Sequence, residues 1–154
     1  MPASAQTTEP AASGAKLLAS GWTLGCRPAG EAKELLCEGA QTITVEQTRQ
    51  TVLGVFVTPA PGAPTAFALR FQLPHGLDIP AGVKMQIDDK AADAPVIQTS
   101  GQAGLFARAP LTDALLATLK KGALLTVEVT ALNGSKLTVP VPLEGFSAVF
   151  AKLQ

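Results

Sequence analysis

The chain has 154 residues, a length typical of a single domain that buries its own core. Its 12 basic and 12 acidic residues give a formal net charge of zero, so neither a long-range field nor a basic run would attract nucleic acid. No apolar run approaches the roughly 20 residues of a membrane-spanning helix, so we expect a protein that neither binds nucleic acid nor spans a membrane.

The first residues, MPASAQTTEPAASGAK, are small and polar and offer few side chains to a core. We therefore predict a flexible arm over residues 1–19 and one β-rich domain over residues 20–154. Such a start is typical of the segment that follows a removed secretory signal, which favours a mature exported chain. An intact cytosolic start would have the same composition.

Both cysteines of the chain lie in the stretch GWTLGCRPAGEAKELLCEG, residues 21–39. A zinc site would need two further ligands, yet the chain has one histidine, His75. A redox centre needs cysteines closer together at the start of a helix. The segment between Cys26 and Cys37 is typical of a turn joining two strands, so the two side chains would lie side by side.

We therefore predict a disulfide between Cys26 and Cys37, with two free thiols as the alternative. Disulfides persist in oxidising compartments, which favours a periplasmic or secreted protein. Trp22 lies just before this segment and is predicted to pack in the core, with stacking on a ligand as the alternative. No metal ion or cofactor is expected.

Alternation of apolar and polar residues predicts the strands. It is clearest in AFALRFQL, where Phe67, Leu69 and Phe71 share one face as candidate core residues and Arg70 and Gln72 share the other. The segment 51–57 is apolar on both faces, which predicts a strand covered on both sides. Similar alternation predicts further strands around residues 43–45, 83–88, 124–131 and 136–143.

Two segments depart from this period. In PLTDALLATLKKG, Thr112 can cap a helix whose last turn carries Lys120 and Lys121. The C-terminal LEGFSAVFAKLQ has weaker helical spacing and could instead end as an extended segment. Asn133-Gly134 between two alternating runs indicates a hairpin. We predict a mainly β fold, an antiparallel β-sandwich or barrel-like fold of six or more strands with one or two short helices.

Candidate interaction loops follow from the turn signals at residues 59–65, 74–82 and 99–106. Within them we single out His75, Asp78, Ser100 and Leu105. His75 is the one candidate general base of its type, but no nucleophile and orienting carboxylate can be placed beside it, which favours a solvated turn histidine over a catalytic one. We therefore expect no catalytic residues.

The order of these features resembles the invasion-associated locus B (IalB) family of exported bacterial proteins from about residue 20 to the C-terminus. The resemblance is carried by the W-x-x-x-C opening at Trp22 and Cys26, by Cys37, and by LPHGLDIPAGVKMQID, which is similar to the family's LP-x-G-x-x-x-x-x-G-x-x-x-x-ID segment. It continues through TSGQAGLFARAPL, LLATLKKGALLTVEV and the closing PVPLEGFSAVFAKL. Family members commonly carry a second cysteine pair in a T-C-x-x-x-G-C pattern, where this chain has Ser100 and Leu105, so we expect residues 99–106 to be freer to move.

The resemblance implies export to the periplasm or surface, a β-rich fold and an association with host-cell invasion or interaction, without an enzymatic reaction. We therefore hypothesise an exported, noncatalytic binding protein whose partner is a protein of the bacterial envelope or the host cell. The alternatives are a periplasmic chaperone or stress protein, or a small hydrolase that uses His75.

Overall fold

The computed structural model describes residues 16–28, 35–60, 63–92 and 94–153. In this part of the chain two antiparallel sheets are joined by short turns and two α-helices. The elements are β1 (Leu17–Ala19), β2 (Thr23–Pro28), β3 (Leu35–Val45), β4 (Thr51–Ala60), β5 (Ala63–Leu73), the 3-10 helix η1 (Ile79–Ala81), β6 (Val83–Ile87), β7 (Lys90–Ala92), β8 (Val96–Gly101), β9 (Gly104–Pro110), α2 (Asp113–Lys121), β10 (Leu124–Thr130), β11 (Lys136–Pro142) and α3 (Phe146–Leu153).

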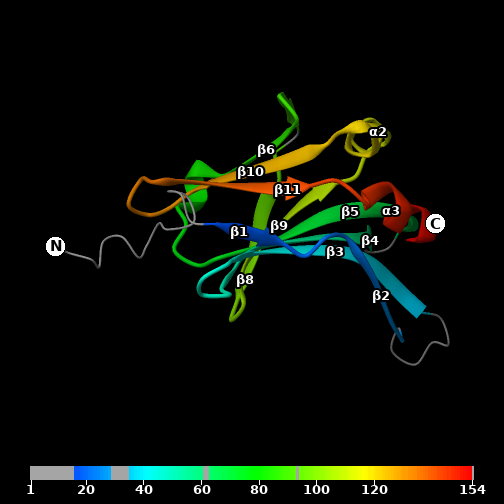
Figure 1. The fold of residues 1–154 in the computed structure, drawn as a ribbon, viewed down its shortest axis with the longest axis horizontal. Coiled ribbons are helices and arrows are strands. Elements are labelled where there is room, and N and C mark those ends of the chain that lie inside the picture. Colours follow the sequence, from blue (N-terminus) through cyan, green and yellow to red (C-terminus); the bar gives the residue numbers. More distant parts are fainter. Residues whose placement is uncertain (1–15, 29–34, 61–62, 93, 154) are drawn as a thin grey trace.

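The larger sheet has the strand order β1-β3-β4-β5-β9-β8, and β2 also pairs with β3 beyond the end of β1. The smaller sheet has the order β11-β10-β6-β7. In Figure 1 the strands of the smaller sheet lie above β1, β3, β4 and β5. The predicted mainly β, antiparallel fold with short helices is therefore confirmed. No helix among the described residues is long and apolar enough to span a bilayer.

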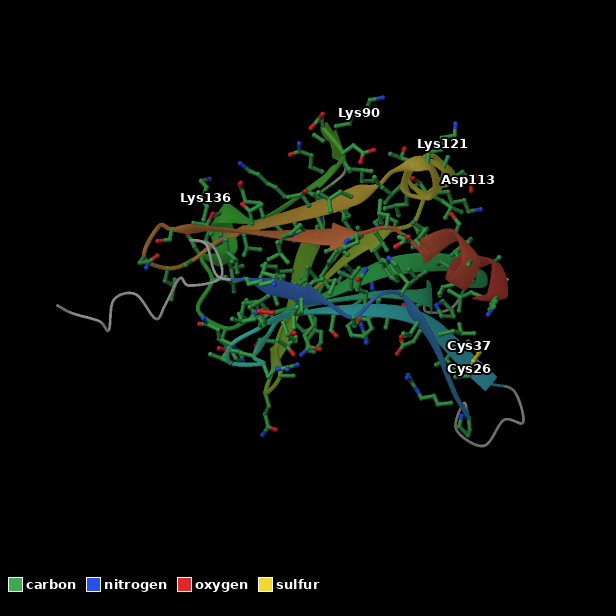
Figure 2. The ribbon with its side chains drawn as sticks, in the orientation of Figure 1. Cys26, Cys37, Lys90, Asp113, Lys121 and Lys136 are labelled. Atoms are coloured by element: carbon green, nitrogen blue, oxygen red, sulfur yellow. A yellow bond between two sulfur atoms is a disulfide. The ribbon has the colours of Figure 1, made fainter. Side chains whose placement is uncertain are left out.

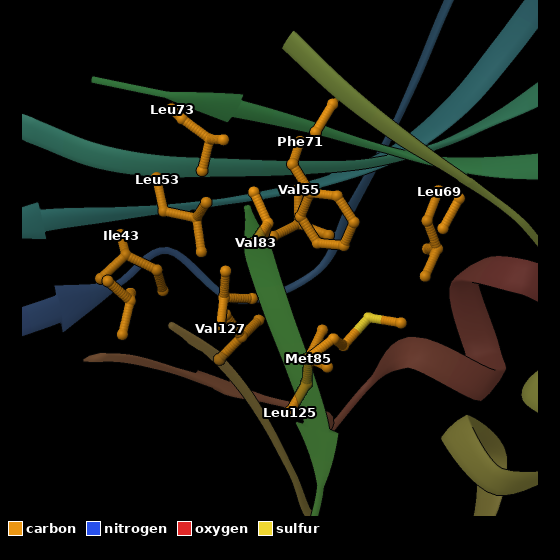
Figure 3. Packing of buried hydrophobic residues seen from close by; sticks show 14 of the residues in the cluster. Ile43, Leu53, Val55, Leu69, Phe71, Leu73, Val83, Met85, Leu125 and Val127 are labelled. Atoms are coloured by element: carbon orange, nitrogen blue, oxygen red, sulfur yellow. The ribbon is translucent and has the colours of Figure 1, made fainter. Parts of the chain in front are cut away.

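The core lies between the two sheets, where the alternating residues of both meet. Leu69 and Phe71 of β5 are buried as predicted, and they face Met85 of β6 across the core (Figure 3). Phe67 is only partly buried, and its ring packs edge-on at 5.1 Å against the ring of Phe150. Burial of these side chains is the main contribution to holding the sheets together. Each Å² of apolar surface removed from water stabilises the fold by roughly 25 cal/mol.

Segment 51–57, which was predicted to be a strand covered on both faces, lies in β4 and is fully covered on one face only. Val55 and Val57 point into the core and are buried. Phe56 points to the opposite face of the sheet and is half-buried, with the Arg70 guanidinium of the neighbouring strand 5.1 Å from its ring centre. The outer face of this strand is therefore partly covered by a side chain of its own sheet.

Both predicted helices are present in the structure. The Thr112 hydroxyl accepts a hydrogen bond of 3.2 Å from the Leu115 N–H and so caps α2. The C-terminal segment forms α3, a helix and not an extended end, and it buries Phe146 and Phe150. Helix α3 packs closely on β3 because Gly39 has no side chain: a Cβ at Gly39 would lie 2.8 Å from Cγ1 of Val149.

One buried amide side chain ties the two sheets together. Gln41 of β3 is 1% exposed and is the one buried polar side chain among the described residues. Its Oε1 accepts a hydrogen bond from the Gly21 N–H at 3.0 Å, and its Nε2 donates to the Pro142 carbonyl of β11 at 2.9 Å. The indole Nε1 of Trp22 donates to the same carbonyl at 2.9 Å. We call this set of hydrogen bonds, which joins Gln41 to the Gly21 N–H and the Pro142 carbonyl and joins Trp22 to the same carbonyl, the Gln41 clasp.

The predicted flexible arm of residues 1–19 lies mainly outside the described residues, which begin at residue 16. Its last three residues form β1, in which Leu17 pairs with Val45 and Ala19 with Ile43. The sheet therefore begins before residue 20, because Leu17 contributes an apolar side chain that packs against the core.

We predict that replacing Gln41 with methionine destabilises the protein by about 1–3 kcal/mol, because the partly buried Gly21 N–H loses its acceptor. Urea unfolding followed by circular dichroism measures this change. The matched control is Gln47→Met, since Gln47 lies exposed in a turn and its loss should leave the unfolding midpoint unchanged. A Gln41→Met variant as stable as the wild type would contradict the importance of the clasp.

Candidate functional site

The two cysteines lie in a two-stranded ribbon formed by β2 and the beginning of β3. Cys26 and Cys37 are direct partners in the antiparallel register, with their Cα atoms 4.0 Å apart, and their sulfur atoms form a disulfide (Figure 2). The predicted disulfide is therefore present in the structure. The turn was predicted for the whole segment between the cysteines, residues 27–36. Its two ends belong to β2 and β3, and residues 29–34 lie outside the described residues.

This ribbon extends away from the body of the protein (Figure 1). All six residues of β2 are exposed, and β3 pairs with β4 only from Gly39 onward. Because an isolated two-stranded ribbon is marginally stable in water, the disulfide supplies a covalent link where little packing is present. The link is structural, since it joins strands that are already paired.

The predicted interaction residues of loop 74–82 have different environments. His75 is exposed, and its Nε2 lies 3.3 Å from the Gln102 carbonyl oxygen in the turn between β8 and β9. Asp78 is half-buried, and its backbone N–H donates to the Thr130 carbonyl at 2.8 Å. The loop is thus attached to two neighbouring hairpins.

Residues 99–106, which the sequence predicted to be a loop, form the end of a β-hairpin of β8 and β9. Ser100 is exposed on the edge strand and is the direct cross-strand partner of Leu105. Leu105 is buried in the core, so the prediction that its side chain belongs to a surface loop is wrong. The physical reason lies at Gly104, which has φ 140° and no side chain and can therefore lie directly against the backbone of Leu73. This close approach lets β9 pair with β5 from Leu105 onward, with the Leu105 side chain facing the core.

A distinctive cluster lies on the outer face of the larger sheet, the face turned away from the core. We call it the arginine face and define it by Phe56, Arg70, Gln98, Phe106 and Arg108. These residues come from β4, β5, β9 and β8, which are consecutive in the sheet. The sheet therefore brings together side chains that lie far apart in the sequence.

Two arginines of like charge lie directly opposite one another on this face. Arg70 of β5 and Arg108 of β9 are partners in the register. The three ion pairs between described residues join other groups, so neither arginine is paired with a described carboxylate. Like charges in directly opposed positions destabilise a sheet, so a contribution to the stability of the fold does not explain this pair.

Aromatic rings hold Arg70 in place. The Cζ atom of its guanidinium lies 5.1 Å from the centre of the Phe56 ring on one flanking strand and 5.8 Å from that of Phe106 on the other. Each such contact stabilises the cation by about 0.5–1 kcal/mol at a partly exposed site. The Nε atoms of Arg70 and Arg108 are buried and have no hydrogen-bond partner among the described residues.

A β-bulge adds polar groups to the same face. The register between β8 and β9 shifts between Ile97 and Thr99, which leaves Gln98 as the extra residue. A bulge places two neighbouring side chains on one side of a strand and can redirect one of them. Gln98 and Thr99 accordingly both line a hollow of about 250 Å³ beside the two arginines.

A second, more apolar hollow adjoins this one, and Gln98 and Arg108 line both. It has a volume of about 440 Å³ and lies where β5, β8 and β9 approach the start of α2. We call it the apolar hollow. Its apolar lining comes from Ala66, Phe67, Ala68, Val96, Pro110 and Leu111. Val96 on the edge strand is 63% exposed, so the hollow opens beside an accessible apolar side chain.

Sequence reasoning placed Arg70 on a polar strand face but did not identify the arginine face. The signal that was present is the alternation in FARAP, which puts Phe106 and Arg108 on one face. Pairing them with Arg70 requires the strand register, which the alternation alone does not give. Gln41 was also missed, although it shares the period-two pattern of Ile43 and Val45 and could have been recognised as a polar residue on an apolar face.

The fold and the exposed ribbon define a two-sheet β-protein with one structural disulfide. The family model described as "Invasion associated locus B (IalB) protein" matches residues 22–154. The chain therefore belongs to the IalB family, as its sequence features predicted. The match begins at Trp22 and includes both cysteines, both helices and every strand of the two sheets except β1.

Individual relatives agree with this assignment. The chain is 28% identical over 134 residues to invasion protein B homologs from two strains of Brucella abortus, covering 86% of this chain and 75% of each relative. It is similar in fold to the crystal structure of invasion associated protein B from Bartonella henselae, with a TM-score of 0.74 and 20% sequence identity. That similarity covers 86% of this chain and 89% of the Bartonella protein.

We predict that replacing both Cys26 and Cys37 with serine loosens the ribbon and leaves the body folded. Amide hydrogen exchange should become faster in residues 23–28, because their pairing with β3 is no longer held by a covalent link. Exchange in β10 and β11, which lie in the other sheet, serves as the internal control. The free energy of unfolding should fall by no more than about 3 kcal/mol. Faster exchange throughout both sheets would contradict a role confined to the ribbon.

Proposed function

We propose that this protein is an exported, noncatalytic binding protein whose arginine face contacts a protein partner of the bacterial envelope or the host cell. The observation that carries the proposal is the pair of directly opposed arginines, without described carboxylate partners, beside an open apolar hollow. Charged groups that lack internal partners and border apolar surface are typical of recognition sites.

Two observations support export to the periplasm or the exterior. The disulfide lies in an exposed ribbon, and exposed disulfides persist in oxidising compartments. The relatives from Brucella and Bartonella are named as invasion proteins, which supports a contribution of this chain to host-cell interaction. The exposed His75 and Ser100 and the half-buried Asp78 stay predicted contact residues for the partner.

The surroundings of His75 favour binding over hydrolysis. A hydrolase that used this histidine would need a carboxylate to orient its ring and a nucleophile beside it. In the described part of the chain, the ring is instead within hydrogen-bonding distance of the Gln102 backbone carbonyl. His75 thus has a contact that attaches its loop to the β8–β9 turn.

Site-specific photocrosslinking in cells of the source bacterium tests the proposed binding face. A photoreactive amino acid replaces Gln98 in one variant and Lys84 in a second, and mass spectrometry identifies the crosslinked proteins. Gln98 lies on the arginine face, whereas Lys84 is exposed on β6 of the other sheet. We expect one reproducible protein partner from the Gln98 variant and a much weaker yield from the Lys84 variant.

An excess of unmodified protein should compete with the Gln98 crosslink, because both bind the same partner. Equal crosslinking from both positions, or no crosslinked protein from Gln98, would contradict the proposal. Crosslinks to many unrelated unfolded proteins would favour the chaperone alternative and would also count against a specific partner.

A further inference from the structure

We propose that Arg70 and Arg108 bind carboxylate groups of an acidic, extended peptide segment of the partner, while the apolar hollow accepts a neighbouring apolar side chain. This inference rests on the proposed function, because it specifies the chemistry of the partner at the same face. The arginine pair supplies the charge and the hollow supplies the apolar contact.

The surroundings of Arg70 favour an oxyanion ligand. Phe56 and Phe106 contact its guanidinium from the two flanking strands, and aromatic rings do not accept the in-plane hydrogen bonds that the N–H groups of a guanidinium form. A carboxylate can accept two such hydrogen bonds from one guanidinium. Arg108 brings a second positive charge opposite the first. A carboxylate between them would relieve the repulsion of two like charges.

The small number of basic groups favours a peptide over a polyanion. Outward-facing residues of β4, β5, β8 and β9 include two cations, Arg70 and Arg108, among aromatic, small and polar neutral side chains. Nucleic acids and sulfated polysaccharides carry many regularly spaced charges and are held by extended basic surfaces. A short acidic segment needs only one or two cationic groups.

The adjoining hollow explains why the ligand should also carry an apolar residue. Gln98 and Arg108 line both hollows, so the anionic and apolar groups of the ligand would be close neighbours. In an extended peptide, residues two apart project from the same side at a spacing of about 7 Å. A segment in which acidic and apolar residues occupy such positions would place one group on the arginines and the other in the hollow.

Fluorescence anisotropy with the full-length oxidised protein tests this inference. The probe is a labelled peptide of glutamate and leucine residues separated by serines. One control peptide has glutamine in place of each glutamate, and a second has serine in place of each leucine. We expect both controls to bind about tenfold or more weakly than the probe, the first because it lacks the charge and the second because it lacks the apolar contact.

Variants of the protein distinguish the contribution of the arginine charge to peptide binding from that of the planar shape of the guanidinium. Arg108→Gln should weaken binding of the acidic peptide by about tenfold or more, and Arg70→Gln should do the same. Arg108→Lys keeps the charge but loses the planar fork, so it should cause a smaller loss. Arg49→Gln makes the same change in an exposed turn and should leave binding unchanged. In the absence of peptide, the urea unfolding midpoint of Arg108→Gln should be equal to or higher than that of the wild type. Such a result would show that the variant binds more weakly although it is still folded.

Several results would overturn the inference. These are equal binding of the glutamate and glutamine peptides, unchanged binding by Arg108→Gln, or binding of heparin or inorganic phosphate without binding of the peptide. If the Gln98 crosslink to a protein partner persists while the acidic peptide fails to bind, the carboxylate inference is wrong and the proposed function still stands. Loss of the crosslink with retained peptide binding would instead contradict the proposed function.

Discussion

The buried amide of Gln41 is the constraint on which the arrangement of the two sheets depends. Apolar packing is non-directional and would allow the sheets to shift against each other, whereas hydrogen bonds fix a position. The Gln41 clasp joins β3 to the end of β11 and also holds the segment of Gly21 and Trp22 that leads into β2. Trp22 further packs edge-on against Phe146 at 5.1 Å, so helix α3 is attached at the same point. Both sheets, the ribbon and the C-terminal helix thus meet around one carbonyl group.

Because the inner faces of both sheets hold the fold, the outer face of the larger sheet is available for other roles. Its central strands carry side chains whose arrangement is not optimal for stability, since Arg70 and Arg108 are directly opposed like charges. The aromatic contacts of Arg70 offset part of this cost and fix the position of the charge. The same contacts would reduce the entropy lost when a ligand binds, because they restrict the Arg70 side chain before binding.

The sequence predicted those features that depend on local pattern. Alternation along β5 identified Leu69 and Phe71 as core residues, and the capping residue Thr112 marked the start of α2. The disulfide could be predicted because Cys26 and Cys37 flank a predicted turn and are close in the sequence, so their pairing needs no long-range information.

The candidate site could not be predicted in the same way, because it depends on the strand register. Arg70 and Arg108 belong to strands that are adjacent in the sheet but not in the sequence, and the side chains of Gln41 and Trp22 reach a carbonyl more than 100 residues away in the chain. Leu105 shows a different error: it was assigned to a loop because it stands where family members carry a second cysteine, whereas Gly104 beside it allows a close approach to Leu73 and Leu105 is buried in the core.

NMR spectroscopy of the arginine side chains is the most direct measurement of whether the outer face binds. The chain has four arginines, so their Nε–Hε signals can be assigned by single substitutions. During a titration with an acidic peptide, we predict that the signals of Arg70 and Arg108 move together while those of Arg27 and Arg49 stay in place. Unchanged Arg70 and Arg108 signals, with shifts confined to the loop of residues 74–82 or to the ribbon, would contradict the assignment of the binding face.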